Sequence, residues 1–378
     1  MTRLKIAVIG VGALGRHHAR ILAGLDSVDL VAVAEPNAEI GQSVADSCGC
    51  GHLSDFHDLL EDVDAVTVAV PTSAHLSVAG DCLKAGLPVM VEKPIAGNLD
   101  DAALLVDLAD RHKLVLQVGH VERFNPAVEA AFGQIDRPRY LQIQRLSPFA
   151  FRSTDIGVVH DLMIHDLELA LALVESPIRN VSALGISLMG GHEDCVQARI
   201  EFTNGCIADI SASRVHPEPR RVLTSWSASG CVHVDLHTRQ LKTLRPSQAL
   251  LSGPSPLELA AVPGADIDAL KQSVFGELIS VREPEISDSD ALTGELQHFV
   301  DCVKHGRAPL VGGPEALRAM VAADQVLASV NAHLWDGHAA GAKGPNARRT
   351  TSQAACPPPL RDWLRSCLSQ RPPLNSPL

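Results

Sequence analysis

Aromatic residues and long apolar runs are both scarce in this sequence. Only one tyrosine, three tryptophans and eight phenylalanines occur among 378 residues, so Val, Leu, Ala and Ile have to fill the cores. No apolar run reaches the roughly 20 residues that a membrane-spanning helix needs, and the first run is too short for a signal peptide. We therefore expect a soluble, cytoplasmic protein without a membrane partner.

Positive charge and paired cysteines are also lacking. The chain has 32 Lys and Arg against 44 Asp and Glu, a net charge of −12 that disfavours a nucleic-acid partner. Its nine cysteines are odd in number and scattered, which excludes a disulfide framework. Cys48, Cys50 and His52 lie in a glycine-rich turn without a second ligand pair, so we predict no metal site.

The order of apolar segments predicts two domains and a tail. Within residues 1–120, short apolar runs alternate with helical patterns, as in a doubly wound parallel sheet of the Rossmann type. Within 121–335, strand patterns follow one another, and a helix at 159–174 and two closing helices accompany them. The predicted fold is therefore α/β: a Rossmann domain, then a C-terminal α+β domain with a largely antiparallel open sheet. Residues 245–287 are expected to be irregular.

The last segment, residues 336–378, differs in composition from the rest. It carries six basic and two acidic residues, and it is rich in Pro, Gly, Ala and Ser. Such a composition buries little apolar surface, so we predict a disordered tail.

A glycine motif follows the first predicted strand. Gly10, Gly12 and Gly15 form a G-x-G-x-x-G turn between that strand and a helix, with Ala13 and Leu14 opening the helix. Such a turn lets the backbone approach a pyrophosphate at the helix N-terminus. The alternative is an ordinary glycine-rich turn.

Glu35 stands twenty residues after Gly15, at the end of the second predicted strand. An acid at this place accepts hydrogen bonds from the adenosine ribose and repels a 2′-phosphate, so we predict NAD rather than NADP. The alternative is a solvated acid at a strand end.

Two further segments follow predicted strands at the same sheet edge, where open α/β sheets bind ligands. Pro71, Thr72 and His75 come after the strand at 65–70, and Thr72 or its neighbour can cap the next helix. His75 is a cofactor contact or an exposed first-turn residue. Glu92 and Lys93 come after the strand at 89–91. A lysine there can polarise a substrate oxygen, although an isolated lysine is usually only solvated.

Asp161 and His165 are four residues apart in the helix predicted at 159–174, which places both on one face. Histidine is the natural base for a hydroxyl proton near neutral pH, and Asp161 can orient it or bind substrate. The alternative is a helix with polar surface residues.

Together these motifs resemble the glucose–fructose oxidoreductase/inositol dehydrogenase (Gfo/Idh/MocA) family over residues 4–335. The segment from Gly119 to Pro126 and the pattern from Glu295 through Phe299 to Pro314 also match. The resemblance implies that Lys93, Asp161 and His165 form the catalytic set, that NAD is the cofactor, and that the protein is a homo-oligomer.

Within the family, residues 119–126 and 152–161 are similar to enzymes that oxidise the 3-hydroxyl of UDP-N-acetylglucosamine before an aminotransferase acts. We therefore expect a nucleotide sugar, with Arg123, Asn125 and Arg152 joining Asp161 and His165 in binding it. A diphosphate needs cations, and the candidates are Arg145, Arg152, Arg214, Arg220 and Arg221. The alternatives are an inositol or simple-sugar dehydrogenase and a non-catalytic dinucleotide-binding regulator. Loss of the lysine or histidine would favour the regulator, and both are present.

Overall fold

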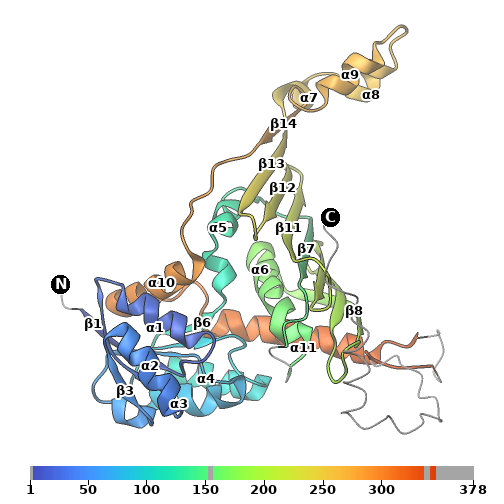
Figure 1. Ribbon diagram of the computed structural model, residues 1–378. Coiled ribbons are helices and arrows are strands. Elements are labelled where there is room, and N and C mark those ends of the chain that lie inside the picture. The colour runs from blue at the N-terminus through green and yellow to red at the C-terminus, as the bar shows by residue number, and fades with distance from the viewer. Residues whose placement is uncertain (1–2, 152–155, 336–340, 346–378) are drawn as a thin grey trace, which may run out of the picture.

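The computed structural model describes residues 3–151, 156–335 and 341–345, so Arg152 and most of the predicted tail lie outside it. The described chain forms two domains beside each other, with a long arm that extends from the second (Figure 1). In that part of the chain no helix is long and apolar enough to cross a membrane. The same residues contain no His, Cys, Asp and Glu cluster that could hold a metal ion.

The first domain is built on a six-stranded sheet in the order β3-β2-β1-β4-β5-β6, with every neighbouring pair parallel. The strands are β1 Leu4–Ile9, β2 Val28–Ala34, β3 Gly51–Leu53, β4 Ala65–Val68, β5 Val89–Glu92 and β6 Leu116–Gly119. The helices between them are α1 Gly15–Ala23, α2 Ala38–Cys48, α3 His75–Lys84 and α4 Leu99–His112. This arrangement confirms the predicted Rossmann domain.

Successive side chains of β1 point to opposite faces of the sheet, and both faces are covered by helices. Ile6 and Val8 pack into a core with α1, whereas Ala7 and Ile9 pack into a second core with α3 and α4. A strand that is buried on both faces reads as a continuous apolar run, which is why the sequence identified it.

The second domain has an eight-stranded sheet in the order β14-β13-β12-β11-β7-β10-β9-β8. Only β7 and β10 pair in parallel; the other neighbours are antiparallel, which confirms the predicted type of sheet. Its strands are β7 Tyr140–Leu146, β8 Ile178–Ile186, β9 Cys195–Phe202, β10 Ile207–Ser213, β11 Arg220–Ser227, β12 Gly230–Asp235, β13 Gln240–Pro246 and β14 Ile279–Arg282. Helices α5 (Pro126–Phe132), α6 (Ile164–Val174) and α11 (Gly313–Ala332) pack on this sheet.

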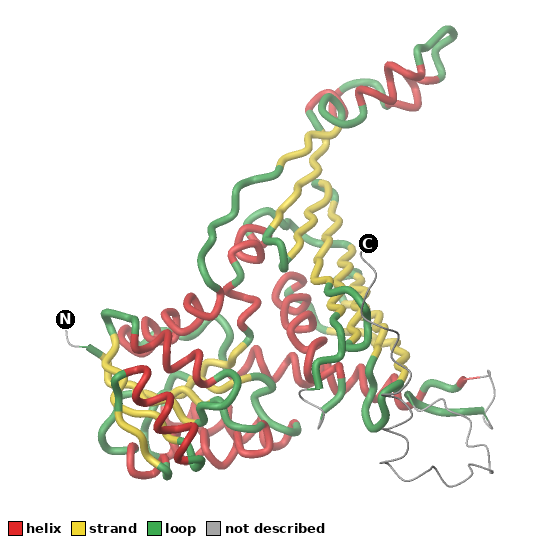
Figure 2. Tube along the Cα trace, in the orientation of Figure 1, coloured by secondary structure: helices red, strands yellow, loops and turns green. Residues whose placement is uncertain are grey.

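The segment predicted to be irregular forms the arm. Strands β13 and β14 pair at its base, and between them lie α7 Gln248–Ser252, α8 Pro256–Ala260 and α9 Ile267–Ser273. These three helices contribute no buried residue and point away from both domains (Figures 1 and 2). The prediction of irregular structure over residues 245–287 is therefore wrong for these helices, for β14 and for the last two residues of β13.

The chain returns to the first domain near its end. Helix α10 (Ala291–His305) places Leu296, Phe299 and Val300 in the core beside α1, and the first half of α11 packs in the core beside α4. The domain limits 1–120 and 121–335 stay a prediction, and α10 and α11, from the second range, also pack in the cores of the first domain. Residues 341–345 also return to the body, because Ser187 donates a backbone hydrogen bond to the carbonyl oxygen of Pro345. The limits of the predicted tail, 336–378, stay a prediction.

Candidate active site

The glycine turn has the backbone geometry that the motif requires. Gly10 has a φ of 81°, and a Cβ on Gly15 would lie 1.8 Å from the carbonyl oxygen of Gly10. A Cβ on Gly12 would meet no atom within 4 Å. Gly10 and Gly15 are thus required by the fold, whereas Gly12 leaves an open approach to the backbone. Ala13 and Leu14 are exposed beside it, before α1 begins.

A cavity of about 600 Å³ opens beside this turn and contains Glu35. Its walls include Gly10, Gly12 and Pro71. The carboxylate of Glu35 accepts backbone hydrogen bonds from Val11 at 3.2 Å and from Asn37 at 3.1 Å, so it is fixed at the mouth of the turn. An open turn, an apolar cavity and a carboxylate at the strand end fit an adenosine with its ribose hydroxyls.

His75 is buried and connects two loops at the sheet edge. Its Nδ1 lies 2.9 Å from the carbonyl oxygen of Pro94, and its Nε2 lies 3.0 Å from that of Val70. Burial lowers the pKa of His75. The side chain therefore positions the loops around the cavity. Thr72 opens a short 3₁₀ turn at residues 72–74, and the predicted side-chain cap is wrong for both Thr72 and its neighbour.

Glu92 lies in a buried cluster beneath the sheet edge. One of its oxygens is 3.1 Å from Nε2 of His18 on α1, and its carboxylate occupies the space over Gly119 that a Cβ would fill. Burial raises the pKa of Glu92, but the hydrogen bond and charge of His18, with the charge of Lys93, outweigh burial and lower it overall. Glu92 is therefore a charged anchor behind Lys93.

Lys93 links the two domains. Its Nζ donates a hydrogen bond of 2.5 Å to the main-chain oxygen of Asp161 and lies 3.3 Å from the Asp161 carboxylate. Asp161 belongs to a π-helical turn, Val159–Met163, which runs directly into α6. Turns of this kind occur often at functional sites. The sequence predicted one α-helix from residue 159. That prediction is wrong for residues 159–163, because Asp161 lies in the π-helical turn and the α-helix begins only at Ile164.

His165 lies one residue inside α6 and is buried. Burial, together with the positive charges of Lys93 and Arg145, holds the pKa of His165 well below the usual value for histidine. The ring is therefore neutral at physiological pH and able to accept a proton. Lys93 and Asp161 thus contact each other where the first domain faces the second, and His165 lies near enough for the charge of Lys93 to act on it.

Two predicted substrate contacts hold other parts of the fold. Arg123 pairs with Glu168 at 2.8 Å, and its guanidinium lies over the ring of Phe132. Asn125 caps α5 by accepting from the backbone N–H of Ala127, and its amide donates to the main-chain oxygen of Leu236. Both atoms of the Asn125 amide group are thus used within the fold.

The arginines predicted to bind a diphosphate fall into two groups, buried and exposed. Arg145 is buried between Glu122 at 2.6 Å and Asp166 at 2.7 Å, and Arg214 is buried against Asp194. These carboxylates already neutralise both guanidinium groups. Arg220 and Arg221 lie exposed on β11, with Arg221 3.6 Å from Glu122, and Arg152 is outside the described residues.

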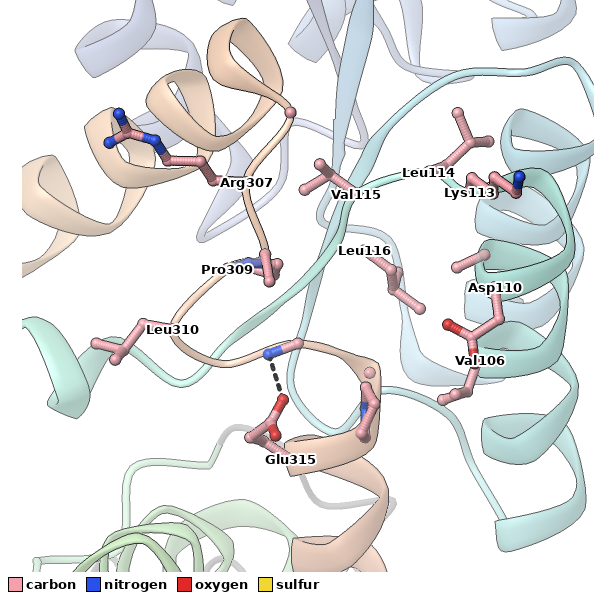
Figure 3. Close-up of a pocket in the computed structure, with 16 residues that line it drawn as sticks. Val106, Asp110, Lys113, Leu114, Val115, Leu116, Arg307, Pro309, Leu310 and Glu315 are labelled. Atoms are coloured by element: carbon pink, nitrogen blue, oxygen red, sulfur yellow. Dashed lines mark hydrogen bonds between the residues drawn. The ribbon is translucent and has the colours of Figure 1, made fainter.

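Another cavity, of about 470 Å³, lies away from these residues, between α4, β6 and the loop before α11 (Figure 3). Lys113 and Arg307 lie at its sides, and the Glu315 carboxylate accepts the N–H of Gly312 at 3.1 Å. It contains none of the predicted site residues.

Sequence reasoning assigned no role to three buried polar residues around Lys93: His18, His120 and Glu295. His120 comes two residues after the strand predicted at 115–118, at the sheet edge, which is the signal that identified Lys93 after the strand at 89–91. His18 and Glu295 carry no comparable signal, because each faces the sheet from a helix whose register only the packed structure reveals.

Comparison with known proteins gives consistent matches. A family model described as an oxidoreductase family with an NAD-binding Rossmann fold matches residues 4–120, and the GFO/IDH/MocA C-terminal domain matches residues 127–230. A UDP-N-acetylglucosamine 3-dehydrogenase of Acidithiobacillus ferrooxidans is 33% identical over 88% of this chain and 99% of that protein. A scyllo-inositol 2-dehydrogenase of Bacillus subtilis is 27% identical over 82% and 89%.

Solved structures agree with these matches. A structure of the Acidithiobacillus ferrooxidans enzyme has a TM-score of 0.76 and 32% identity, covering 87% of this chain and 98% of that one. A levoglucosan dehydrogenase in complex with NADH and levoglucosan has a TM-score of 0.73 at 18% identity, covering 87% and 97%, which shows a shared fold.

Proposed function

The chain belongs to the Gfo/Idh/MocA family of NAD-binding oxidoreductases, and we propose that it oxidises carbon 3 of UDP-N-acetylglucosamine to a ketone. The observation that carries this proposal is the contact of Lys93, from the Rossmann domain, with Asp161 of the second domain, where the charge of Lys93 also acts on His165. The 33% identity to a UDP-N-acetylglucosamine 3-dehydrogenase over most of both chains supports the substrate.

The proposed chemistry assigns a task to each of these side chains. His165 takes the proton of the sugar hydroxyl, since its lowered pKa leaves a ring nitrogen free of a proton. Lys93 stabilises the negative charge that develops on the oxygen, and Asp161 holds the ammonium group at 3.3 Å. When bound along the glycine turn, with Glu35 at its ribose, NAD supplies the acceptor for the hydride leaving the carbon.

The nucleotide part of the substrate supplies binding energy at a distance from the reacting carbon. Exposed Arg220 and Arg221, with Arg152, are the candidate contacts for its diphosphate. Remote binding energy can position carbon 3 for hydride transfer, so removing the nucleotide should lower kcat as well as raise KM.

The test is to follow NADH formation with UDP-N-acetylglucosamine, free N-acetylglucosamine and myo-inositol side by side. We expect kcat/KM for the UDP-sugar to exceed that for the free sugar by about 10² or more. Replacing Arg220 and Arg221 together should narrow this difference while NAD binding stays unchanged. Equal turnover of the free sugar would refute the nucleotide-sugar proposal.

A second candidate substrate is an inositol, because the scyllo-inositol 2-dehydrogenase also matches along most of its length. Faster turnover of myo-inositol in the same assay would select it. We further propose that the protein is a homo-oligomer and that a downstream aminotransferase consumes the ketone. A non-catalytic regulator would bind NAD but form no NADH with any of the three compounds.

A further inference from the structure

Two histidine rings contact each other beside Lys93, one from each domain. His120 follows β6 directly, and His165 lies at the start of α6. Their ring centroids are 5.7 Å apart, and the ring planes are nearly perpendicular at 82°. Both rings are buried, with 1% of His120 and 9% of His165 exposed.

Three of the four nitrogens on these rings are enclosed without a hydrogen-bond partner among the described residues. They are Nδ1 and Nε2 of His120 and Nδ1 of His165. Nε2 of His165 is not one of these enclosed atoms, and 9% of the residue is exposed. Buried polar atoms of this kind are normally paired, because an unpaired one has lost its hydration.

The two rings are almost close enough to form a hydrogen bond with each other. An N–H···N hydrogen bond of about 2.9 Å between two imidazoles places their centroids roughly 5 Å apart. The observed 5.7 Å and 82° give contact without such a bond, so pairing requires the rings to approach by roughly half an ångström and the His120 ring to turn a nitrogen edge toward His165.

A histidine base needs a group that fixes its tautomer. In many enzymes a carboxylate accepts a hydrogen bond from one ring nitrogen and leaves the lone pair on the other. No carboxylate is hydrogen-bonded to His165 in the described chain, and His120 is the ring beside its enclosed nitrogen.

We propose that His120 is the positioning residue for His165: its neutral ring accepts a hydrogen bond from Nδ1–H of His165 and leaves the lone pair on Nε2, toward the substrate. This inference rests on the proposed role of His165 as proton acceptor. It adds a tautomer assignment and a second histidine from the other domain.

The surrounding charges keep His120 neutral. Burial and the nearby positive charge of Lys93 lower its pKa to about 3, Arg123 acts in the same direction, and Glu92 opposes them. The charged groups that face His165 are Lys93, Arg145 and Arg221. Asp161 and Asp166 share its helical segment, but Lys93 and Arg145 respectively pair with them.

A neutral acceptor has a chemical consequence. An aspartate in this place would stabilise the protonated ring of His165 by an ion pair and raise its pKa. His120 fixes the orientation without that charge. His165 is therefore ready to accept a proton at lower pH and releases it again readily after the hydride has left.

The test compares three substitutions in the full-length enzyme with NAD bound. His120→Phe keeps an edge-to-face ring but removes the acceptor, His120→Asn restores a neutral acceptor, and His120→Asp supplies a charged one. With UDP-N-acetylglucosamine, we expect His120→Phe to lose about 10²-fold in kcat with little change in KM, and His120→Asn to recover most of it. His120→Asp should move the acidic limb of the kcat–pH profile to higher pH.

Nitrogen NMR of histidine-labelled enzyme supplies a readout that needs no turnover. We expect His165 to carry its proton on Nδ1 in the wild type and in His120→Asn, and to show a mixture of tautomers in His120→Phe. Thermal unfolding and NAD binding check that each variant is folded. If His120→Phe does not fold, the Asn and Asp variants still decide the question by the pH profile and the tautomer.

Some outcomes would overturn the proposal. An Nε2–H tautomer in the wild type would refute it, as would equal kcat values and pH profiles for all three variants. A large rise in the sugar KM with kcat retained would show instead that His120 contacts the substrate. Failure of the proposed function is a separate result: full turnover in His165→Ala would remove the base itself, whatever the tautomer.

Discussion

The groups proposed for catalysis come from both domains, and their side chains can be removed without touching the glycine turn. Lys93 and His165 lie at the domain junction, whereas the cavity that fits the adenosine is bounded by Gly10, Gly12 and Glu35. Turnover and cofactor binding should therefore separate on mutation.

We predict that Lys93→Met and His165→Ala each lower kcat by about 10²–10⁴-fold, since a proton acceptor or a charge-stabilising group is lost. NAD binding, followed by fluorescence titration, should change by less than a few-fold. Lys113→Met, at an exposed position on the other side of the first domain, is the matched control. Near-normal turnover in either variant removes that residue from the mechanism.

Glu295 carries a fully buried carboxyl group. Neither of its oxygens has a hydrogen-bond partner among the described residues, and burial together with the charge of Glu92 raises its pKa well above 4.5. The folded protein thus keeps a proton that the unfolded chain releases. The stability it provides is fully present below pH 4.5 and is lost as pH rises toward the folded-state pKa.

Glu295→Gln, which keeps the shape but cannot ionise, should remove this dependence. We expect the wild type to lose stability relative to the variant as pH rises, by up to about 1.4 kcal/mol per pH unit over that range. Urea unfolding at several pH values from 5 to 8 measures the difference. Glu61→Gln, at an exposed glutamate, is the control. Parallel pH curves for Glu295→Gln and the wild type would contradict a protonated Glu295.

Among the structural elements, the glycine turn contains one glycine that the fold requires and another that the cofactor requires, within six residues. A Cβ on Gly15 would overlap the carbonyl oxygen of Gly10, while a Cβ on Gly12 would project into open space. We predict that Gly15→Ala destabilises the protein by about 1–3 kcal/mol.

Gly12→Ala should instead unfold at the wild-type temperature and bind NAD at least roughly tenfold more weakly, because the methyl group blocks the approach of the pyrophosphate. Calorimetry and NAD titration of the two variants measure both effects. The assignment of roles within the turn fails if Gly12→Ala binds NAD normally.

Individual strands and helices show how far the sequence alone could predict the structure. Strands buried on both faces, such as β1 at Leu4–Ile9, and long amphipathic helices, such as α10, were predicted within one or two residues. β14 was missed because its four residues are partly or fully exposed within a Pro- and Ser-rich segment, and β13 was missed although it has seven residues.

The candidate site was predicted where motif and strand end coincide, as at Lys93. The residues that support the site from behind were not predicted. The partnership of His18 with Glu92 joins residues 74 positions apart, and the π-helical turn at Asp161 changes the facing of side chains without any sequence signature. Both depend on how the elements pack, and one sequence does not contain that information.

At the scale of the whole molecule, the arm between β13 and β14 stands apart from both domains (Figure 1). Its short helices begin at caps supplied by Ser247, Ser255 and Asp266, so the sequence specifies them locally. Yet its large apolar side chains are exposed: 83% of Leu257, 66% of Leu251 and 65% of Phe275. Isolated helices of five to seven residues are not stable alone, and exposed apolar groups of this kind mark contact surfaces.

We predict that the arm stabilises the proposed homo-oligomer and that the body folds without it. The backbone N–H of Ser247 donates to the carbonyl oxygen of Leu278 at 2.9 Å, so the two chain ends at the base of the arm already lie side by side. Replacing residues 248–277 with Asn-Gly should therefore close β13 and β14 as a two-residue hairpin. The variant should bind NAD and unfold cooperatively, because α7, α8 and α9 contribute no buried residue to either core.

Light scattering after gel filtration measures the outcome. We expect the wild type to be larger than one chain and the arm deletion to give a smaller assembly at the same protein concentration, with Leu257→Asp shifting the mass in the same direction. Leu104→Asp, at a half-exposed leucine on α4, should leave the mass unchanged. If the deletion variant keeps the wild-type mass, the arm is not an assembly contact, and its apolar side chains then require another partner, because water alone does not stabilise so extended a segment.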